Sequence, residues 1–275
     1  MQLNALGADV MVITDDADMA AAIGACVPPV RALIEIDTGE GRGGLRADDP
    51  RLGEIASRLG ASLQGVMTHA GHSYAGRSPA EMAAFAETER AGAVAAAERL
   101  RALGHACPII SAGSTPTALY AESQEGLTEI RAGVYMFGDL FQAGIGSHGV
   151  EDIAMTVLTS VIGRRAPEHR LLLDAGGLAL SKDRSTEALP QDDGFGLVRD
   201  LDGRPGLGRA VVSRAYQEHG VVELDPALPF PDLGIGGRVR VLPNHTCMTA
   251  AAHDRYYVVD GGREVVEVWT RVNGW

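Results

Sequence analysis

Residues 63–81, LQGVMTHAGHSYAGRSPAE, contain the unit that decides the fold: an apolar strand, a polar loop and the start of a helix. The run 63–68 predicts a buried strand. Ser78 is a helix-capping residue followed by proline at the first helical position, and Gly104 follows the last turn of the helix. The segment therefore predicts a βα unit.

Similar units occur on both sides of this one. Apolar strands are predicted at residues 10–14, 32–37, 108–110 and 129–137, with helices after Asp15-Asp16 and Asp49-Pro50. Nearly all-apolar strands that alternate with capped helices predict a parallel sheet buried on both faces. Polar clusters follow the carboxyl ends of the strands, where βα barrels build their active sites. Five strands are too few to close such a barrel, so the pattern alone leaves an open α/β sheet as the alternative.

The second half of the chain changes character after about residue 147. Short strands separated by Gly, Pro and Asp clusters predict an all-β sandwich or barrel. They are expected at residues 155–162, 171–174, 207–212, 220–224, 238–242, 256–259 and 265–270. The polar stretch 184–196 predicts an exposed loop. We therefore expect an α/β domain at residues 1–147 and a β-rich domain at residues 148–275.

Composition limits the possible partners. The 275-residue chain is 45% hydrophobic and 22% charged, which is typical of a soluble globular protein. Its net charge of −12 argues against nucleic acid or an anionic membrane as a partner. Three scattered cysteines and the absence of a signal-peptide pattern in the first residues favour a reducing, cytoplasmic location.

A pair of metal-binding residue types lies near the end of the sequence. His245 and Cys247 are two residues apart, a spacing that places both side chains on one face of an extended strand. An imidazole and a thiolate form half of a tetrahedral zinc site. A buried cysteine beside a hydrogen-bonded histidine is the alternative interpretation.

Three further loops carry candidate site residues. Gly113, Ser114 and Thr115 follow the fourth predicted strand and offer N–H groups and hydroxyls to a phosphate, although a simple turn is equally consistent with them. His69 and His72 flank a glycine at the end of the third strand. The loop 37–44 contains an acid, several glycines and Arg42.

Seven segments taken together resemble one family, and they span nearly the whole chain. They are DTGEGRGG (37–44), THAGHSY (68–74), SAGSTPT (111–117), TEIRAGVYMFGD (128–139), LLLDAGGLALSKD (171–183), YQEHG (216–220) and PNHTC (243–247). The combination resembles the D-threonine aldolase and D-serine dehydratase group of pyridoxal-phosphate enzymes. That group shares the alanine-racemase-like fold (fold type III), so the resemblance implies a partial TIM-type (β/α)8 barrel, about five of eight strands, followed by a β-rich domain.

The resemblance also implies roles for individual residues. His69 and His72 would be the catalytic residues on the substrate side, beside Tyr74, and a divalent metal would bind His245 and Cys247. The remaining cofactor contacts would be Arg42 near the ring, and Gly113, Ser114, Thr115, Gly133, Val134 and Tyr135 around the phosphate. The implied cofactors are pyridoxal 5′-phosphate and zinc, or another divalent metal such as manganese. The implied substrate is a small D-3-hydroxy amino acid, and the His-x-Cys pair favours dehydration over aldol cleavage. The full-length form would be a homodimer.

One departure from the family is large. Its Schiff-base lysine lies on the first barrel strand, whereas the only lysine here is Lys182, in the segment 171–183. We therefore expect this chain to be an N-terminally truncated form of a pyridoxal-phosphate- and metal-dependent lyase, and inactive by itself. One alternative is a metal-only hydrolytic enzyme that uses His245, Cys247 and His72. The other is a non-catalytic remnant that binds a partner through the open edge at residues 10–14.

Overall fold

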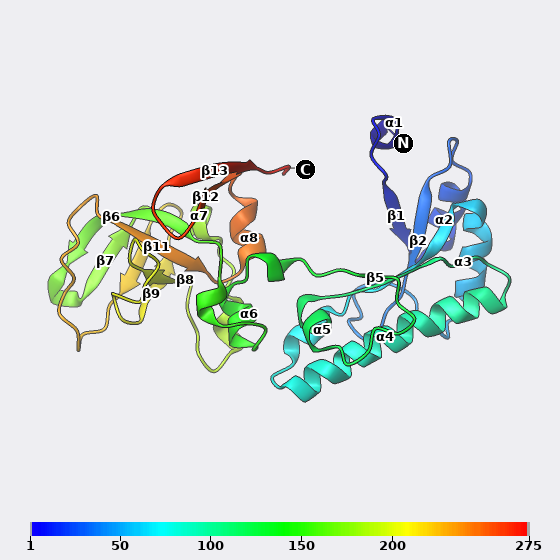
Figure 1. Cartoon of the computed structure of the whole chain (residues 1–275), viewed down its shortest axis with the longest axis horizontal. Coiled ribbons are helices and arrows are strands. Elements are labelled where there is room, and N and C mark those ends of the chain that lie inside the picture. Colours follow the sequence, from blue (N-terminus) through cyan, green and yellow to red (C-terminus); the bar gives the residue numbers. More distant parts are fainter. Residues whose placement is uncertain (1, 274–275) are drawn as a thin grey trace. The chain divides into compact units, whose positions relative to one another are not determined.

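The computed structural model describes residues 2–273. The chain forms two compact units, the first ending at Gly133 and the second beginning at Val134 (Figure 1). Each unit has its own hydrophobic core. No helix in the described part of the chain combines the length and the apolar character needed to cross a membrane.

The first unit is built on a five-stranded parallel sheet with the order β1-β2-β3-β4-β5. Its strands are β1 (Met11–Thr14), β2 (Arg31–Glu35), β3 (Leu63–Met67), β4 (Ile109–Ala112) and β5 (Glu129–Ile130). Its helices are α1 (Gln2–Ala5), α2 (Ala17–Gly24), α3 (Arg51–Leu59), α4 (Pro79–Ala102) and α5 (Thr115–Tyr120), with 3₁₀ turns η1 (Gly60–Ser62) and η2 (Gly71–Ala75). The predicted parallel α/β organisation is therefore confirmed for this unit.

The predicted helix starts depend on side-chain caps. The Asp16 carboxylate accepts the backbone N–H of Met19 at 2.8 Å and so opens α2. The Ser78 hydroxyl accepts the N–H of Glu81 at 3.3 Å, and Pro79 occupies the first turn of α4. Caps of this kind satisfy N–H groups that have no partner inside the helix.

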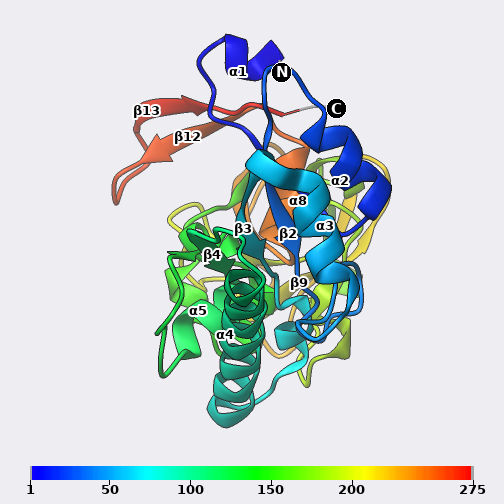
Figure 2. The ribbon, with the colours of Figure 1, turned by 90° about the vertical axis from the view of Figure 1, so that its right-hand side faces the viewer.

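Helices α2, α3 and α4 pack on one face of the sheet (Figure 2). The core contains strand residues from that face, such as Ile34, Val66 and Ile110, together with side chains of α2, α3 and α4. Ile13 belongs to the other face and is 50% exposed. The prediction that the strands are buried on both faces therefore fails for β1, which pairs only with β2 among the described strands.

The fifth strand is much shorter than predicted. The sequence predicted residues 129–137, but β5 contains only Glu129 and Ile130. Its neighbour β4 ends at Ala112, so a longer β5 would have no strand to pair with on that side. The chain instead continues into the 3₁₀ turn η3 (Val134–Met136).

The second unit is a closed antiparallel barrel with the strand order β10-β7-β6-β11-β8-β9. These strands are β6 (Val157–Arg165), β7 (Arg170–Leu173), β8 (Gly196–Arg199), β9 (Ala210–Ala215), β10 (Gly220–Glu223) and β11 (Arg238–Pro243). A separate hairpin is formed by β12 (Arg255–Val259) and β13 (Val265–Thr270). The unit's helices are α6 (Leu140–Gly144), α7 (Gly177–Leu180) and α8 (Thr246–Ala251), with 3₁₀ turns η4 (Val150–Asp152), η5 (Ala166–Glu168) and η6 (Ser185–Ala188). Of the two predicted all-β forms, the structure has the barrel, and β8 is the strand that sequence patterning missed.

The second unit also begins earlier than the predicted boundary at residue 147. Helix α6 contacts the segment after β11, because the Asp139 carboxylate accepts the N–H of Thr246 at 2.9 Å. The N–H of Phe141 also donates to the Asn244 carbonyl at 3.3 Å. These contacts place residues 134–147 with the barrel.

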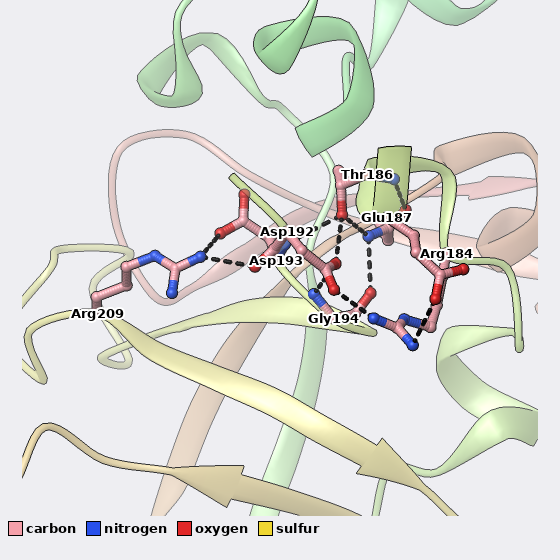
Figure 3. Close-up of polar contacts among 8 residues, drawn as sticks. Arg184, Thr186, Glu187, Asp192, Asp193, Gly194 and Arg209 are labelled. Carbon is pink, nitrogen blue, oxygen red and sulfur yellow. Dashed lines mark hydrogen bonds and ion pairs between the residues drawn. The ribbon is translucent and has the colours of Figure 1, made fainter. Parts of the chain in front are cut away.

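The polar stretch 184–196 is not the exposed loop that its composition predicted. Thr186 is 0% exposed and Asp193 is 5% exposed, because their polar groups bond to one another (Figure 3). The N–H of Asp193 donates to the Thr186 hydroxyl at 3.0 Å, and Arg209 donates to the Asp193 carboxylate at 2.8 Å. Polar groups can be buried at low cost when each one finds a partner in this way.

Candidate active site

The predicted site residues fall into two sets, one in each unit. The first unit contains Arg42, His69, His72, Tyr74, Gly113, Ser114, Thr115 and Gly133, and the second contains Val134, Tyr135, His245 and Cys247. Val134 and Tyr135 lie in η3, at the start of the second unit. Gly133 follows β5, whose neighbour β4 leads into residues 113–115.

The loop after β3 has one histidine with a fixed tautomer. His69 Nδ1 is 2.9 Å from the Gly113 carbonyl oxygen, which can only accept a hydrogen bond. The Nδ1 atom therefore carries the hydrogen, and in the neutral ring Nε2 is left as a proton acceptor. The ring of Tyr74 lies 6.4 Å from that of His69, measured between centroids.

His72 lies beside the glycine-rich loop after β2. Its ring packs edge-on against Phe85 at 5.1 Å, and its buried Nδ1 atom has no hydrogen-bond partner in the described structure. A Cβ atom at Gly39 would come within 3.2 Å of His72 Nε2, a tight contact that glycine avoids. The positive φ of Gly39, 131°, requires the same residue type.

Asp37 shapes the glycine-rich loop by accepting the N–H groups of Gly39 and Gly41 at 2.9 and 3.0 Å. Burial alone would raise the pKa of the Asp37 carboxyl, but these backbone hydrogen bonds outweigh burial and hold the pKa below its usual value. Arg42 in the same loop lies 3.7 Å from the Glu35 carboxylate and 3.5 Å from that of Glu40. Its guanidinium is mostly solvent-exposed and is available to an additional anion.

The loop after β4 has the features that a phosphate group needs. Gly113 has φ of 140°, and a Cβ atom there would lie 2.0 Å from the Arg131 carbonyl oxygen, so only glycine fits. Thr115 is 1% exposed, and its hydroxyl has no partner among the described residues. A buried hydroxyl without a partner is costly in a folded protein, which indicates that it bonds to a ligand. On this observation the residues fit a bound phosphate.

Two charged residues of this region were missed by sequence reasoning. Arg131 donates to the Thr68 carbonyl at 2.6 Å and to the Ser111 hydroxyl, and burial lowers its pKa. Glu89, on α4, accepts the N–H groups of Ala70 and Gly113. Arg131 lies inside one of the recognised segments, whereas Glu89 gave no signal in the sequence.

The His245–Cys247 pair does not lie on a strand, so that part of the prediction is wrong. Strand β11 ends at Pro243, and His245 is the N-cap of α8, in which Cys247 is the second residue. The two side chains nevertheless lie within hydrogen-bonding reach of each other. The hydrogen bonds that the protonated ring donates, first to Cys247 and then to Asp183, outweigh burial and raise the pKa of His245 to about 9.

Three buried or half-buried residues hold this pair in place. The Asp183 carboxylate lies 2.5 Å from His245 Nδ1, which directs Nε2 away from it. Asp139 is 1% exposed, holds the N–H of Thr246, and has a pKa raised by burial. The Asn244 amide donates to the Thr186 hydroxyl at 2.6 Å and to the Gly194 carbonyl at 2.7 Å. Asp139 and Asp183 lie far from the pair in the sequence, and none of these three residues was predicted as part of the site.

The donor types at this place fit a divalent metal of the zinc kind. One imidazole nitrogen and one thiolate are ligands that zinc prefers. A carboxylate on the other ring nitrogen, here Asp183, is the usual outer partner of a metal-binding histidine. Within residues 2–273 no cluster of three or more His, Cys, Asp or Glu side chains is placed to enclose an ion. The protein therefore offers two donors, and further positions would be left to water or substrate.

Lys182 lies in the barrel unit. Its ammonium donates to the Ala215 carbonyl at 2.5 Å and lies 5.4 Å from the centre of the Phe195 ring. Both contacts are those of a structural lysine.

Comparisons with known proteins match the two units to two family models. Residues 2–140 match the model described as "Alanine racemase, N-terminal domain", and residues 154–259 match that described as "Putative serine dehydratase domain". The D-threo-3-hydroxyaspartate dehydratase of Delftia sp. strain HT23 is 45% identical over all of this chain and 75% of its own length. The D-serine dehydratase of Dictyostelium discoideum is 29% identical over 78% of this chain and 55% of its own length.

Solved structures of such dehydratases and aldolases also match this chain over nearly all of its length. The structure of the Delftia dehydratase has a TM-score of 0.91 and 44% identity, covering all of this chain and 75% of that one. A cysteine-to-alanine mutant of that dehydratase is described as a metal-free form, and another mutant has alanine in place of a histidine two positions before that cysteine. D-threonine aldolase from Filomicrobium marinum has a TM-score of 0.74 and 25% identity over 96% of this chain and 69% of its own.

Proposed function

The chain belongs to the alanine-racemase-like family of pyridoxal-phosphate-dependent lyases that contains D-serine dehydratases and D-threonine aldolases, and from this premise we propose that it supplies the metal, phosphate and histidine parts of a D-3-hydroxy amino acid dehydratase site. The observation that carries the proposal is the His245–Cys247 pair with Asp183 on the far ring nitrogen. A D-threo-3-hydroxyaspartate dehydratase supports it, because a structure described as its metal-free form lacks a cysteine spaced from a histidine in the same way.

The metal would act on the substrate hydroxyl. His245 Nε2 and Cys247 Sγ would hold a divalent ion, and the Lewis acidity of that ion would make a substrate β-hydroxyl a better leaving group. The 45% identity to a hydroxyaspartate dehydratase and the cysteine at the second ligand position support dehydration over aldol cleavage. Zinc is the proposed metal because of the thiolate ligand.

The cofactor would be held by the first unit. When bound, pyridoxal phosphate supplies an electron sink for the substrate's α-carbon. The Thr115 hydroxyl and the backbone N–H of Gly133 would donate to the phosphate. Arg42 and Tyr74 would lie near the ring. His69, whose Nδ1–H is held by the Gly113 carbonyl, keeps Nε2 as an acceptor for a substrate proton, and His72 would line the same side.

Ligand binding by the purified chain tests this function without requiring turnover. Equilibrium dialysis should show one equivalent of zinc and one of pyridoxal 5′-phosphate bound per chain. Thr115→Val should weaken binding of pyridoxal phosphate without changing zinc binding, and Cys247→Ala should do the reverse. Binding of neither ligand by the folded wild-type chain would refute the proposal.

A further inference from the structure

A buried carboxylate in the first unit connects both of its candidate site loops. Glu89 lies on α4 and is 3% exposed. Its Oε1 atom accepts the N–H of Ala70 at 3.0 Å, in the loop after β3, and that of Gly113 at 2.9 Å, in the loop after β4. Its Oε2 atom accepts the Thr117 hydroxyl of α5 at 2.6 Å. A buried carboxylate is tolerated only when it is fully hydrogen-bonded, so these three bonds are what permit Glu89 there.

The short contact with Glu89 determines which hydroxyl is the donor in each neighbouring hydrogen bond. Thr117 has one hydroxyl hydrogen, and the charged acceptor at 2.6 Å takes it in preference to the Ser114 carbonyl at 3.4 Å. In the 2.9 Å contact between the Ser114 and Thr117 hydroxyls, Ser114 is therefore the donor. In the 2.9 Å contact between the Ser73 and Ser114 hydroxyls, Ser73 is then the donor.

With these donors assigned, the Ser114 hydroxyl and N–H have no free hydrogen-bonding position. Its hydroxyl hydrogen goes to Thr117, and its oxygen accepts from Ser73 and from the N–H of Thr117. Its own N–H donates to the Thr117 hydroxyl oxygen at 3.0 Å. The N–H of Gly113 is held by Glu89. Among these three loop residues, Thr115 is the one whose hydroxyl remains available.

We propose that Glu89 is a positioning residue that fixes the separation of the histidine loop and the phosphate loop and commits Ser114 to structure, so that Thr115 is the anion-binding hydroxyl. The proposal rests on the proposed function in one respect, because the anion is taken to be the phosphate of pyridoxal phosphate. The bond from His69 to the Gly113 carbonyl joins the same two loops a second time. Displacement of either loop would therefore move both His69 and Thr115.

The test compares four chains for binding of pyridoxal 5′-phosphate by equilibrium dialysis. Glu89→Ala should weaken binding at least tenfold, because Ala70 and Gly113 lose their shared acceptor. Glu89→Gln should retain more affinity than Glu89→Ala, since its amide oxygen can still accept both N–H groups, although its amide nitrogen cannot accept the Thr117 hydroxyl. Leu100→Ala, a fully buried residue of α4 outside both loops, is the matched control. It should lower stability and leave affinity unchanged.

One further measurement and one further variant keep the outcomes separate. Amide hydrogen exchange of Ala70 and Gly113, measured without ligand, should accelerate at least tenfold in Glu89→Ala and stay slow in Glu89→Gln. If the wild type binds no pyridoxal phosphate but this exchange pattern holds, the proposed function fails and the positioning role stands. If Glu89→Ala does not fold, Glu89→Asp, which is one methylene too short to reach both loops, replaces it. Wild-type affinity in the Ala or Asp variant, or Gln binding as weak as Ala, overturns the proposal.

Discussion

Both units hold their candidate site residues through hydrogen bonds to a carboxylate. The bonded residues are separated by very different distances along the sequence in the two units. In the first unit, Glu89 holds the N–H groups of Ala70 and Gly113, 19 and 24 residues away. In the second, Asp139 holds the N–H of Thr246, 107 residues away, and Asp183 holds His245, 62 residues away. The site in the βα unit is thus assembled from neighbouring segments, whereas the metal pair depends on contacts between segments far apart in the sequence. Substitutions in the second unit should therefore weaken ligand binding and lower stability together more often than substitutions in the first unit do.

The largest expected effect is an absence of turnover in a chain that still binds its ligands. The 275-residue chain, given pyridoxal phosphate, zinc and a D-3-hydroxy amino acid, should form no keto acid or ammonia above background. The family's chemistry needs a lysine at the cofactor, and the only lysine here, Lys182, donates to the Ala215 carbonyl in the barrel unit. A coupled assay for the keto acid measures this. Turnover that disappears in Lys182→Ala would show the opposite and would make Lys182 the cofactor lysine.

Removal of a metal ligand should have the next largest effect. His245→Ala and Cys247→Ala should each lower zinc affinity by ~100-fold or more, because even outer partners of a metal ligand contribute 10–100-fold. Competition with a fluorescent zinc chelator measures the affinity. Cys26→Ala is the matched control, since this half-buried thiol lies in the first unit and donates to the Ala22 carbonyl at 3.4 Å. Equal loss in the control would mean that zinc binds nonspecifically to thiols.

Loss of the outer partner should have a smaller effect on the same site. Asp183→Ala should lower zinc affinity by roughly 10–100-fold, because His245 loses the group that fixes its ring. Asp183→Asn should lose less, since its amide oxygen can still accept the Nδ1–H. Should the Ala variant bind zinc as tightly as wild type, Asp183 would have no orienting role.

The difference between the units also explains what the sequence could predict. The rule that parallel strands place their following loops at one edge located His69, His72 and residues 113–115 correctly without knowledge of Glu89. No such rule applies to the barrel. The two-residue spacing of His245 and Cys247 was interpreted as a strand, but Asn244 is turned inward by Thr186 and Gly194, and the chain enters α8. The stretch 184–196 looked exposed because its composition shows polar groups and not their partners.

The protonation of His245 should make the apparent zinc affinity change about tenfold per pH unit. Its pKa is raised to about 9, above the ordinary value of 6.5, mainly by the hydrogen bond with Cys247. The stabilisation of the metal-free fold by this proton is therefore complete below about pH 6.5 and is lost as the pH rises through 9. Zinc must displace the same proton, so its apparent affinity should rise about tenfold per pH unit between about pH 7 and 9. A flat profile over that range would show that no proton is released from the pair.

The smallest effect tests whether the two units are separable. Ser78 caps α4 by accepting the N–H of Glu81, and loss of an N-cap costs about 1 kcal/mol. Ser78→Ala should lower the free energy of unfolding of the first unit by that amount in urea denaturation. Zinc affinity should stay unchanged, because His245, Cys247 and their partners Asp139 and Asp183 all lie in the second unit. A matched loss in zinc affinity would show that the metal pair depends on the first unit as well, and the contrast between locally and remotely assembled halves would then fail.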